Sequence, residues 1–266
     1  MKIAIIGTGN LGASIAKGLI TTNAITSLYL TKRNVEGIKS FEGYKNVMIS
    51  TNNIEAVKAS DVLIFTVQPG HFEDILDSIK PYISENHVLI SAITGFTIPK
   101  IETHLGSHNY IIRAMPNTAI AVGKSMTCLC SNEHGKKRIK IAEAIFKRLG
   151  HTMTISESHM QAATVVCASG IAFWMRLIRA TTQAAIQLGF DSKEAQELAM
   201  YTSEGAANLL ITSGSHPETE IDKVTTPMGC TIKGLNEMEH NGLSSSLIQG
   251  MVASFEKINN IKKEQI

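Results

Sequence analysis

The chain has 266 residues, enough for one large domain or two ordinary ones with a substantial apolar core. Hydrophobic residues make up 44% of the chain and charged residues 18%, which is a globular composition. The net charge of only +2 argues against a strongly basic surface, so we expect no nucleic-acid partner.

At the N-terminus, a short apolar run stops at Gly7, which is too early for a signal peptide. No uninterrupted apolar stretch elsewhere approaches the roughly 18 residues of a membrane span. We therefore expect a soluble, cytoplasmic protein without a membrane partner.

The first 156 residues alternate between short β-branched runs and amphipathic stretches, which is typical of parallel strands joined by helices. Strands are predicted over Ile3–Ile6, Ser27–Leu30, Val47–Ile49, Val62–Val67, Val88–Ser91, Tyr110–Arg113, Met126–Leu129 and Met153–Ile155. Helical patterns include Gly12–Thr21, Ile54–Ala59, Phe72–Ile79 and Gly135–Leu149. This region is predicted to be an α/β domain with a mostly parallel, doubly wound sheet.

A glycine-rich loop, Gly7–Gly12, fits the pattern G-x-G-x-x-G between the first predicted strand and the first helix. We expect Gly7 to permit a tight turn, Gly9 to let the backbone approach a pyrophosphate, and Gly12 to allow close packing of helix on strand. The helix start at Asn10 and Leu11 would supply amide donors and partial positive charge. The context predicts a dinucleotide-binding Rossmann domain over residues 1–156.

The end of the second predicted strand bears on the choice between NAD and NADP. An NAD site places Asp or Glu there, about 20 residues beyond the loop, to bind the ribose hydroxyls. This chain instead has Lys32, Arg33 and Asn34, and no acid precedes Glu36. Cations and donors suit a 2′-phosphate, although a solvated basic turn is the alternative interpretation. We expect NADPH as the cofactor, with NADH as the second choice.

Two later loops should also reach the cofactor, because ligands bind at the carboxyl ends of parallel strands. One is Val67-Gln68-Pro69 after the fourth predicted strand, and the other contains Ala92 after the fifth.

Beyond residue 156, helical patterns replace the alternation, and residues 157–266 are predicted to form an all-α domain. The predicted helices are Ser158–Ala168, Ile171–Leu188, Ser192–Ser213, Pro217–Val224, Cys230–Glu239 and Leu243–Ile261, with a break at Gly170. The stretch Ala162–Leu188 is nearly apolar, with Trp174 in its middle. We therefore expect a homodimer or larger homo-oligomer built through this domain, and an apolar core helix of a monomer is the alternative.

Neither a catalytic triad nor a paired-carboxylate or metal-ligand pattern stands out in the chain. The four cysteines form no C-x-x-C pair, so we expect no metal site. Cys128, Cys130 and Cys167 are interpreted as small buried residues. The chemistry should therefore come largely from a cofactor, with the protein orienting the substrate.

Two polar segments flank apolar elements. Arg113–Thr118 ends a predicted strand, and Thr225–Ile232 leads into a predicted helix. The Thr/Pro/Gly string of the second could hold a carboxylate on backbone amides at the helix N-terminus. An ordinary turn and N-cap explains the same residues equally well.

These motifs together resemble the pyrroline-5-carboxylate reductase family over nearly the whole chain. Gly7–Gly12 looks like the family's G-x-G-N-[ML]-G, and Arg113–Thr118 is similar to its R-x-M-P-N-T. The string Pro227–Leu235 looks like the family's P-G-G-x-T-I-x-[AG]-L and is the most specific single element. The resemblance implies NADPH-dependent reduction of the C=N bond of 1-pyrroline-5-carboxylate to L-proline, the last step of proline biosynthesis. It also implies a helical C-terminal dimerisation domain.

The resemblance further implies roles for particular residues. The substrate carboxylate should meet the backbone amides of Gly229, Cys230 and Thr231, with Thr226 nearby. The Thr231 hydroxyl should hydrogen-bond the ring nitrogen as the catalytic residue, since a hydroxyl can both accept and donate. Asn117 should border the nicotinamide pocket.

The chain departs from the family pattern at two positions. Ile171 stands where G-S-G-P-A-[YF] has proline, and Met228 stands where P-G-G has its first glycine. Two alternatives therefore stay open: a reductase of the same architecture acting on another cyclic imine or 2-keto acid, and a non-catalytic NADP-binding regulatory protein. The related 3-hydroxyacid dehydrogenases usually carry a lysine after the domain junction, and Ala162–Phe173 has none.

Overall fold

The computed structural model describes residues 1–22 and 25–264. It divides into two compact units. The first comprises Met1–Ser169 and the residues from Phe255 onward, and the second comprises Gly170–Ser254. The domain boundary expected at 156/157 stays a prediction; this division falls later, inside a continuous helix.

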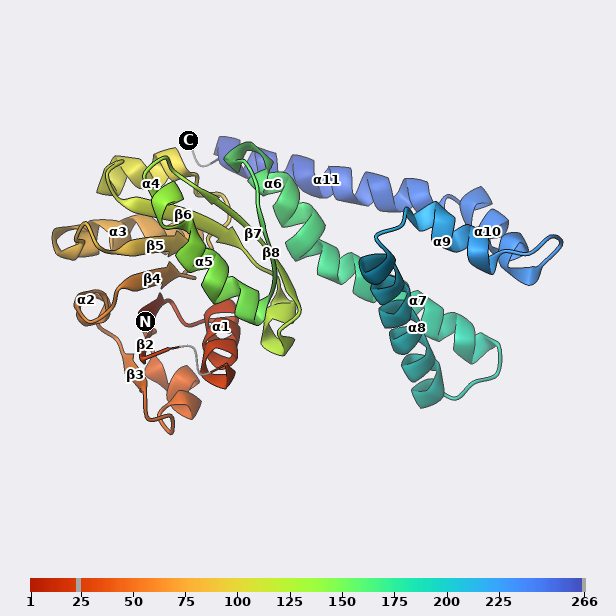
Figure 1. The fold of residues 1–266 in the computed structure, drawn as a ribbon, viewed down its shortest axis with the longest axis horizontal. Helices are drawn as coiled ribbons and strands as arrows, with labels where there is room; N and C mark the ends of the chain where they lie inside the picture. Colours follow the sequence, from red (N-terminus) through yellow and green to blue (C-terminus); the bar gives the residue numbers. More distant parts are fainter. Residues whose placement is uncertain (23–24, 265–266) are drawn as a thin grey trace. The chain divides into compact units, whose positions relative to one another are not determined.

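The first unit is built on an eight-stranded sheet with the order β3-β2-β1-β4-β5-β6-β7-β8 (Figure 1). The strands are β1 (Lys2–Ile6), β2 (Ser27–Thr31), β3 (Val47–Ser50), β4 (Val62–Phe65), β5 (Val88–Ser91), β6 (Tyr110–Met115), β7 (Ser125–Ser131) and β8 (Gly150–Thr154). All adjacent pairs are parallel except β6 and β7. The mostly parallel, doubly wound sheet predicted from the sequence is confirmed.

Alternating side chains of each strand enter two apolar layers, one on each face of the sheet. In β1, Ile3 and Ile5 join one buried cluster, and Ala4 and Ile6 join the other. Because both faces are covered, the strands are apolar runs and not alternating polar patterns.

Different helices cover the two faces. The Ile3 face packs against α1 (Asn10–Thr21), η1 (Val35–Phe41) and α5 (Ile139–Phe146). The Ala4 face packs against α2 (Asn53–Lys58), α3 (Phe72–Ile79), α4 (Ile98–Leu105) and α6 (Met160–Ala163). Helix α4 is an element that the periodicity did not predict, because it is short and begins with Ile98-Pro99 after the N-cap Thr97.

The remaining short elements of this unit are 3₁₀ turns. They are η2 (Pro69–His71), η3 (Lys80–Tyr82), η4 (Thr118–Val122), η5 (Gly135–Lys137), η6 (Lys147–Leu149) and η7 (Glu157–His159). The predicted helix Gly135–Leu149 is thus a central α-helix between two 3₁₀ turns.

The second unit contains only helices in the described residues: α7 (Gly170–Gln187), α8 (Ser192–Ser213), α9 (Pro217–Val224), α10 (Cys230–His240) and most of α11 (Leu243–Glu264). Helix α8 begins with a capping box, in which Asp191 accepts from the Glu194 backbone and Glu194 accepts from the Asp191 backbone. The all-α character predicted for this half is confirmed.

The predicted helix break at Gly170 is wrong. A single helix runs from Glu157 to Gln187, and its irregularity is a π-helical segment, η8 (Thr164–Ser169). Glycine tolerates helical backbone angles, and the wider π turn takes up the irregularity while the chain continues. This helix is long and apolar enough to cross a membrane, and so are some core helices of globular proteins.

Candidate functional site

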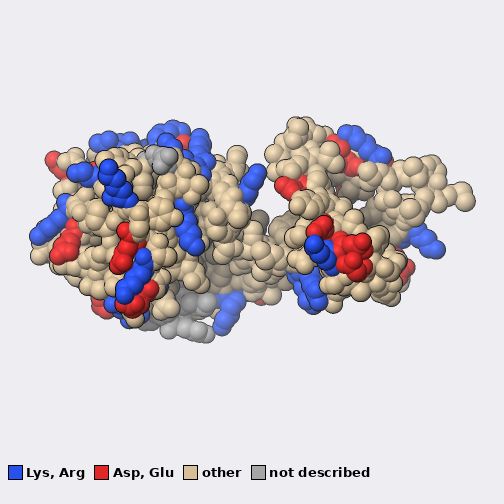
Figure 2. Space-filling view, turned by 90° about the horizontal axis from the view of Figure 1, so that it is seen from below, with Lys and Arg blue, Asp and Glu red and all other residues tan. Residues whose placement is uncertain are grey.

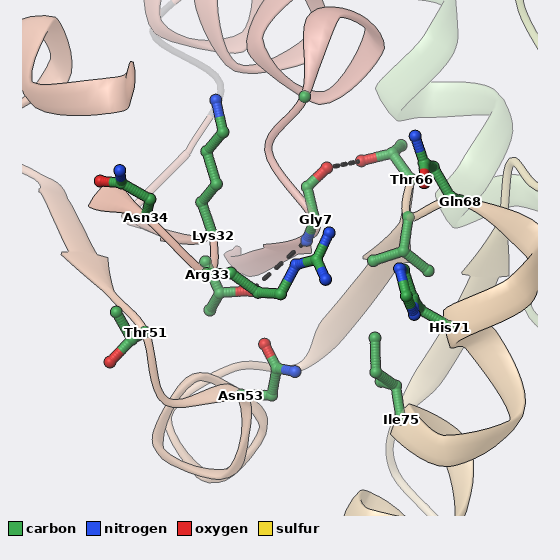
Figure 3. A pocket seen from close by; sticks show the side chains of 13 residues that line it. Gly7, Lys32, Arg33, Asn34, Thr51, Asn53, Thr66, Gln68, His71 and Ile75 are labelled. Atoms are coloured by element: carbon green, nitrogen blue, oxygen red, sulfur yellow. Dashed lines mark hydrogen bonds between the residues drawn. The ribbon is translucent and has the colours of Figure 1, made fainter. Parts of the chain in front are cut away.

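A cavity of about 370 Å³ lies at the carboxyl ends of β1, β2, β3 and β4 (Figure 3). This edge contains the point where the strand order reverses, between β1 and β4, which is where open α/β sheets bind ligands. The lining residues are Gly7, Gly9, Thr31, Lys32, Arg33, Asn34, Thr51, Asn53, Thr66, Val67, Gln68, His71 and Ile75.

The first glycine of the loop is required by the protein itself. Gly7 has φ 91°, which favours glycine, and a Cβ there would lie 2.2 Å from Val67 Cγ1. The Gly7 carbonyl accepts a hydrogen bond from Thr66 Oγ1 at 2.8 Å, which ties the loop to the end of β4. The close approach of Val67 and the hydrogen bond from Thr66 therefore fix the conformation of this turn.

Gly12 is also required by packing, but Gly9 is not. A Cβ at Gly12 would lie 2.6 Å from Thr66 Oγ1, whereas a Cβ at Gly9 would meet only the Gly7 carbonyl oxygen, at 4.0 Å, among the described residues. The space beside Gly9 is therefore open cavity. A methyl group would fill it without disturbing the chain, as expected where a ligand approaches the backbone.

The N-terminus of α1 leaves its first amides available. Its N-cap, Gly9, has no side chain, and no acidic residue stands in the first turn. Such an end carries partial positive charge and unpaired donors, which suit a phosphate. The predicted residues Asn10 and Leu11 form this first turn.

Basic side chains occur where β2 ends. In Figure 3, Arg33 extends across the cavity between Gly7 and Asn53 toward His71, whereas Lys32 points away. Lys32 Nζ lies over Gly37, where a Cβ would be only 2.6 Å from it. Asn34 caps η1 by accepting from the Glu36 backbone N–H at 3.0 Å. No carboxylate is among the lining residues of the described chain, so no negative charge there would repel a bound anion.

Of the predicted cofactor residues, the cavity brings together Gly7, Gly9, Lys32, Arg33, Asn34, Val67 and Gln68. Asn10 and Pro69 directly follow lining residues in the chain but do not line the cavity, and neither do Leu11, Gly12, Ala92 and Asn117. The cavity also includes Thr51, Asn53 and His71, which the sequence analysis did not single out. Thr51 and Asn53 could have been found, because they follow β3 at the same sheet edge.

Asn117 is buried, and its side chain and backbone N–H make three hydrogen bonds. Its backbone N–H donates to Ser125 Oγ at 3.1 Å, and its Oδ1 accepts from the Ala119 N–H at 3.0 Å. Its Nδ2 donates to the Cys167 carbonyl at 2.9 Å. The residue therefore connects the end of β6, the start of β7 and η8.

The predicted substrate residues lie together in the second unit, at the N-terminus of α10. Gly229 is the N-cap and has no side-chain cap, and its N–H donates to the Thr226 carbonyl at 2.9 Å. A Cβ at Gly229 would lie 2.4 Å from Thr226 Oγ1, so the threonine hydroxyl packs directly on the glycine. Cys230 and Thr231 are exposed in the first turn of the helix.

Met228 adopts φ 62°, the one positive φ among the described non-glycine residues. The loop therefore keeps a left-handed backbone at this position although the residue there is methionine, at a cost of roughly 1–2 kcal/mol. The methionine side chain is fully exposed and borders an open hollow lined also by Gly229, Cys230 and Lys233.

Comparisons with known proteins match both units. Residues 157–261 match the family model described as pyrroline-5-carboxylate reductase dimerisation, and residues 2–95 match that described as NADP oxidoreductase, coenzyme F420-dependent. Pyrroline-5-carboxylate reductase 2 of Dictyostelium discoideum is 42% identical over 96% of this chain and 91% of its own length. Pyrroline-5-carboxylate reductase 1 of the same organism is 44% identical, and the chain spans about half of its length (49%).

Solved structures of the same kind share the whole fold. The crystal structure of Plasmodium falciparum pyrroline carboxylate reductase with NADP bound has a TM-score of 0.88 at 26% identity, over 98% of both chains. A pyrroline-5-carboxylate reductase from Coxiella burnetii has a TM-score of 0.90 at 27% identity, over 97% of both chains.

Proposed function

Because the chain belongs to the pyrroline-5-carboxylate reductase family, we propose that it reduces the C=N bond of 1-pyrroline-5-carboxylate to give L-proline, with NADPH as cofactor. The similarity over almost the full length of a relative carries this proposal. The substitutions Ile171 and Met228 are the specific grounds for testing another cyclic imine or a 2-keto acid as well.

The residues of the first cavity fit a dinucleotide phosphate. Gly9 leaves room for a pyrophosphate, and the start of α1 offers amides with no acid nearby. Arg33 extends into the cavity where the 2′-phosphate of NADPH would require a cation. When bound, NADPH supplies the hydride for the reduction. The protein's part is to bind, orient and exclude competing reactions.

The N-terminus of α10 suits the substrate carboxylate. The amides of Cys230 and Thr231 stand in the first turn of a helix without a side-chain cap, where they can donate to an anion. The Gly229 amide, which donates to the Thr226 carbonyl, would have to exchange that acceptor for the carboxylate. We assign the Thr231 hydroxyl to the ring nitrogen, which it would steady as the imine becomes an amine. A carboxylate held there limits the orientations of the ring, which is a large source of rate in bimolecular reactions.

We also propose that the protein works as a homodimer or larger homo-oligomer in the cytoplasm. The match of residues 157–261 to a dimerisation model supports subunit contact, not lipid, as the role of the apolar helix. The same match, which begins at residue 157, supports a functional boundary at 156/157.

The decisive experiment measures NADPH oxidation with 1-pyrroline-5-carboxylate, beside a panel of other cyclic imines and 2-keto acids. We expect turnover with 1-pyrroline-5-carboxylate and little with the rest. Activity on another compound alone would indicate a reshaped pocket around Met228, and NADPH binding without turnover on any compound would favour a regulatory protein.

The Thr231→Ala variant tests the substrate site in the same assay. Loss of a hydrogen bond to a charged group corresponds to a fall in kcat of about 10- to 100-fold, while the Kd for NADPH should stay unchanged. Thr219→Ala, another exposed threonine of the same unit, is the matched control. Unchanged turnover in Thr231→Ala would remove that hydroxyl from the mechanism.

A further inference from the structure

Two cysteines that are 39 residues apart in the chain meet in the first unit. Cys128 lies on β7 and Cys167 on η8, and their Sγ atoms are 3.9 Å apart in a thiol–thiol hydrogen bond. Both contact the same apolar cluster, on the face of the sheet that α6 covers. Among the described residues, no third metal-ligating side chain gathers with them.

The two thiols differ in exposure and in acidity. Cys128 is only 3% exposed, whereas Cys167 is half-buried. The hydrogen bond between the two thiols lowers the pKa of Cys167, and the same hydrogen bond together with burial raises the pKa of Cys128. Cys167 is therefore the better nucleophile and Cys128 a protonated partner beside it, since the thiolate is the reactive form.

A third cysteine provides a contrast. Cys130 lies two residues further along β7, in the same apolar cluster. Burial raises its pKa to about 11, and it has no sulfur partner among the described residues. Position on this strand alone does not make a thiol reactive, and the contact with Cys167 singles out Cys128.

We propose that Cys128 and Cys167 form a reversible, peroxide-oxidised disulfide site. The Cys167 thiolate attacks one oxygen of hydrogen peroxide, the O–O bond breaks, and a sulfenic acid and hydroxide form. The Cys128 sulfur then attacks the Cys167 sulfur, and the sulfenic hydroxyl leaves as water with the Cys128 proton. In sum, two thiols and one peroxide give one disulfide and two waters. The sulfur atoms must approach from 3.9 Å to about 2.05 Å.

The disulfide would act on Asn117, which the family resemblance places at the border of the nicotinamide pocket. The Cys167 carbonyl accepts from Asn117 Nδ2, and the Asn117 N–H is bound to Ser125 at the start of β7. Drawing η8 toward β7 displaces the acceptor on which the Asn117 side chain depends. This consequence rests on the proposed function, and we expect oxidation to lower kcat/KM by at least about tenfold, because a misplacement of about 1 Å can cost 100-fold.

The test begins with the reduced full-length protein, freed of reductant and treated with hydrogen peroxide. We expect two thiols to be lost per chain, a non-reduced digest to contain the Cys128 peptide linked to the Cys167 peptide, and dithiothreitol to restore both thiols. Oxidation confined to Cys230, or a Cys167 carried to sulfinic acid with Cys128 still reduced, would overturn the proposal.

Variants separate the roles of the two thiols. In Cys128→Ser the sulfenic acid on Cys167 should persist and react with dimedone, and in Cys167→Ser the Cys128 thiol should resist peroxide. Cys130→Ala is the matched control and should form the disulfide like the unmodified chain. A dimedone adduct on Cys167 that is equally strong with and without Cys128 would show that the pair does not act together.

The thiol measurements need no reductase activity, so they stand or fall apart from the proposed function. Activity adds a second result: peroxide should inhibit the unmodified chain and Cys130→Ala, dithiothreitol should reverse the inhibition, and Cys167→Ser should be insensitive. A disulfide that forms without any change in NADPH-dependent activity would keep the site and overturn its coupling to Asn117.

Discussion

At the scale of single residues, the glycine loop shows that one motif contains glycines for different physical reasons. Gly7 and Gly12 are required by the fold, because Gly7 has a positive φ and an added Cβ at either position would lie under 3 Å from a neighbouring atom. An added Cβ at Gly9 would instead point into open space. The sequence predicted all three from the pattern, but only the structure separates folding requirements from binding requirements.

Gly9→Ala should therefore weaken cofactor binding more than it weakens the fold. We expect the Kd for NADPH to rise at least about tenfold, equivalent to about 1.4 kcal/mol, since the methyl group occupies the ligand's space. The free energy of unfolding should fall by at most about 1 kcal/mol, because alanine is the poorer N-cap. Fluorescence titration measures the Kd for NADPH, and urea denaturation measures the free energy of unfolding.

Gly43→Ala is the control, because an added Cβ there meets nothing within 4 Å. Equal NADPH binding in the Gly9→Ala and Gly43→Ala variants would contradict this role of Gly9.

Arg33→Ala should change cofactor preference. Loss of a charged hydrogen bond to the 2′-phosphate costs about 1.5–3 kcal/mol, so we expect a 10- to 100-fold higher Kd for NADPH and little change for NADH. Lys32→Ala should have a smaller effect, because that ammonium lies over Gly37. Lys136→Ala, an exposed lysine paired with Glu133, controls for the loss of one positive charge. Equal weakening of NADPH and NADH would exclude a 2′-phosphate contact.

Met228 is the residue at which sequence and structure together say most about specificity. The family pattern has glycine there, and the loop retains the left-handed φ that glycine favours. What differs from the family at this site is an exposed methionine beside Gly229 and Cys230.

At the scale of elements, a buried ion pair fixes the start of the long apolar helix. Arg113 on β6 is 3% exposed, and its Nη1 donates to Glu157 Oε1 at 3.0 Å. The same carboxylate oxygen accepts from the Ile98 N–H at the start of α4. Arg113 Nε is buried without a partner in the described chain. The Glu157 carboxylate is therefore the group that compensates the buried charge of the guanidinium.

Glu157→Ala should strongly destabilise the first unit. Removing one partner leaves a buried, uncompensated charge, which costs about 3–5 kcal/mol. Glu133→Ala, which breaks an exposed ion pair with Lys136, should cost less than about 1 kcal/mol. Urea denaturation of both variants measures the difference. Similar midpoints in the two would show that the Arg113–Glu157 pair contributes no more than a surface pair.

At the scale of the whole molecule, the second unit leaves large apolar side chains exposed in the isolated chain. They include Trp174 (61%), Met175 (59%), Tyr201 (69%), Leu209 (60%) and Ile211 (79%) on α7 and α8. Figure 2 shows uncharged surface over much of this unit, beside a cluster of acidic and basic side chains. Exposed apolar area of this kind marks an interaction surface, in agreement with the dimerisation match.

Light scattering at micromolar concentration should therefore show no monomer of 28.8 kDa. Trp174→Glu should shift the population toward monomer, because a carboxylate is costly to bury in an apolar interface. Tyr44→Glu, at a large exposed side chain of the first unit, should leave the mass unchanged. A monomer in the unmodified chain would assign the apolar helix to another role.

The sequence by itself determined the classes of element, because strand and helix periodicities and turn glycines are local patterns. It predicted the eight strands, the change to helices after residue 156 and the glycine loop. It missed the continuity of the helix through Gly170, since a π turn has no simple sequence signal. Only the tertiary structure decided which distant side chains come together: Cys128 with Cys167, Arg113 with Glu157, and His71 in the cavity beside the glycine loop. Such contacts join residues far apart in the chain, and they depend on strand order and packing that no local period encodes.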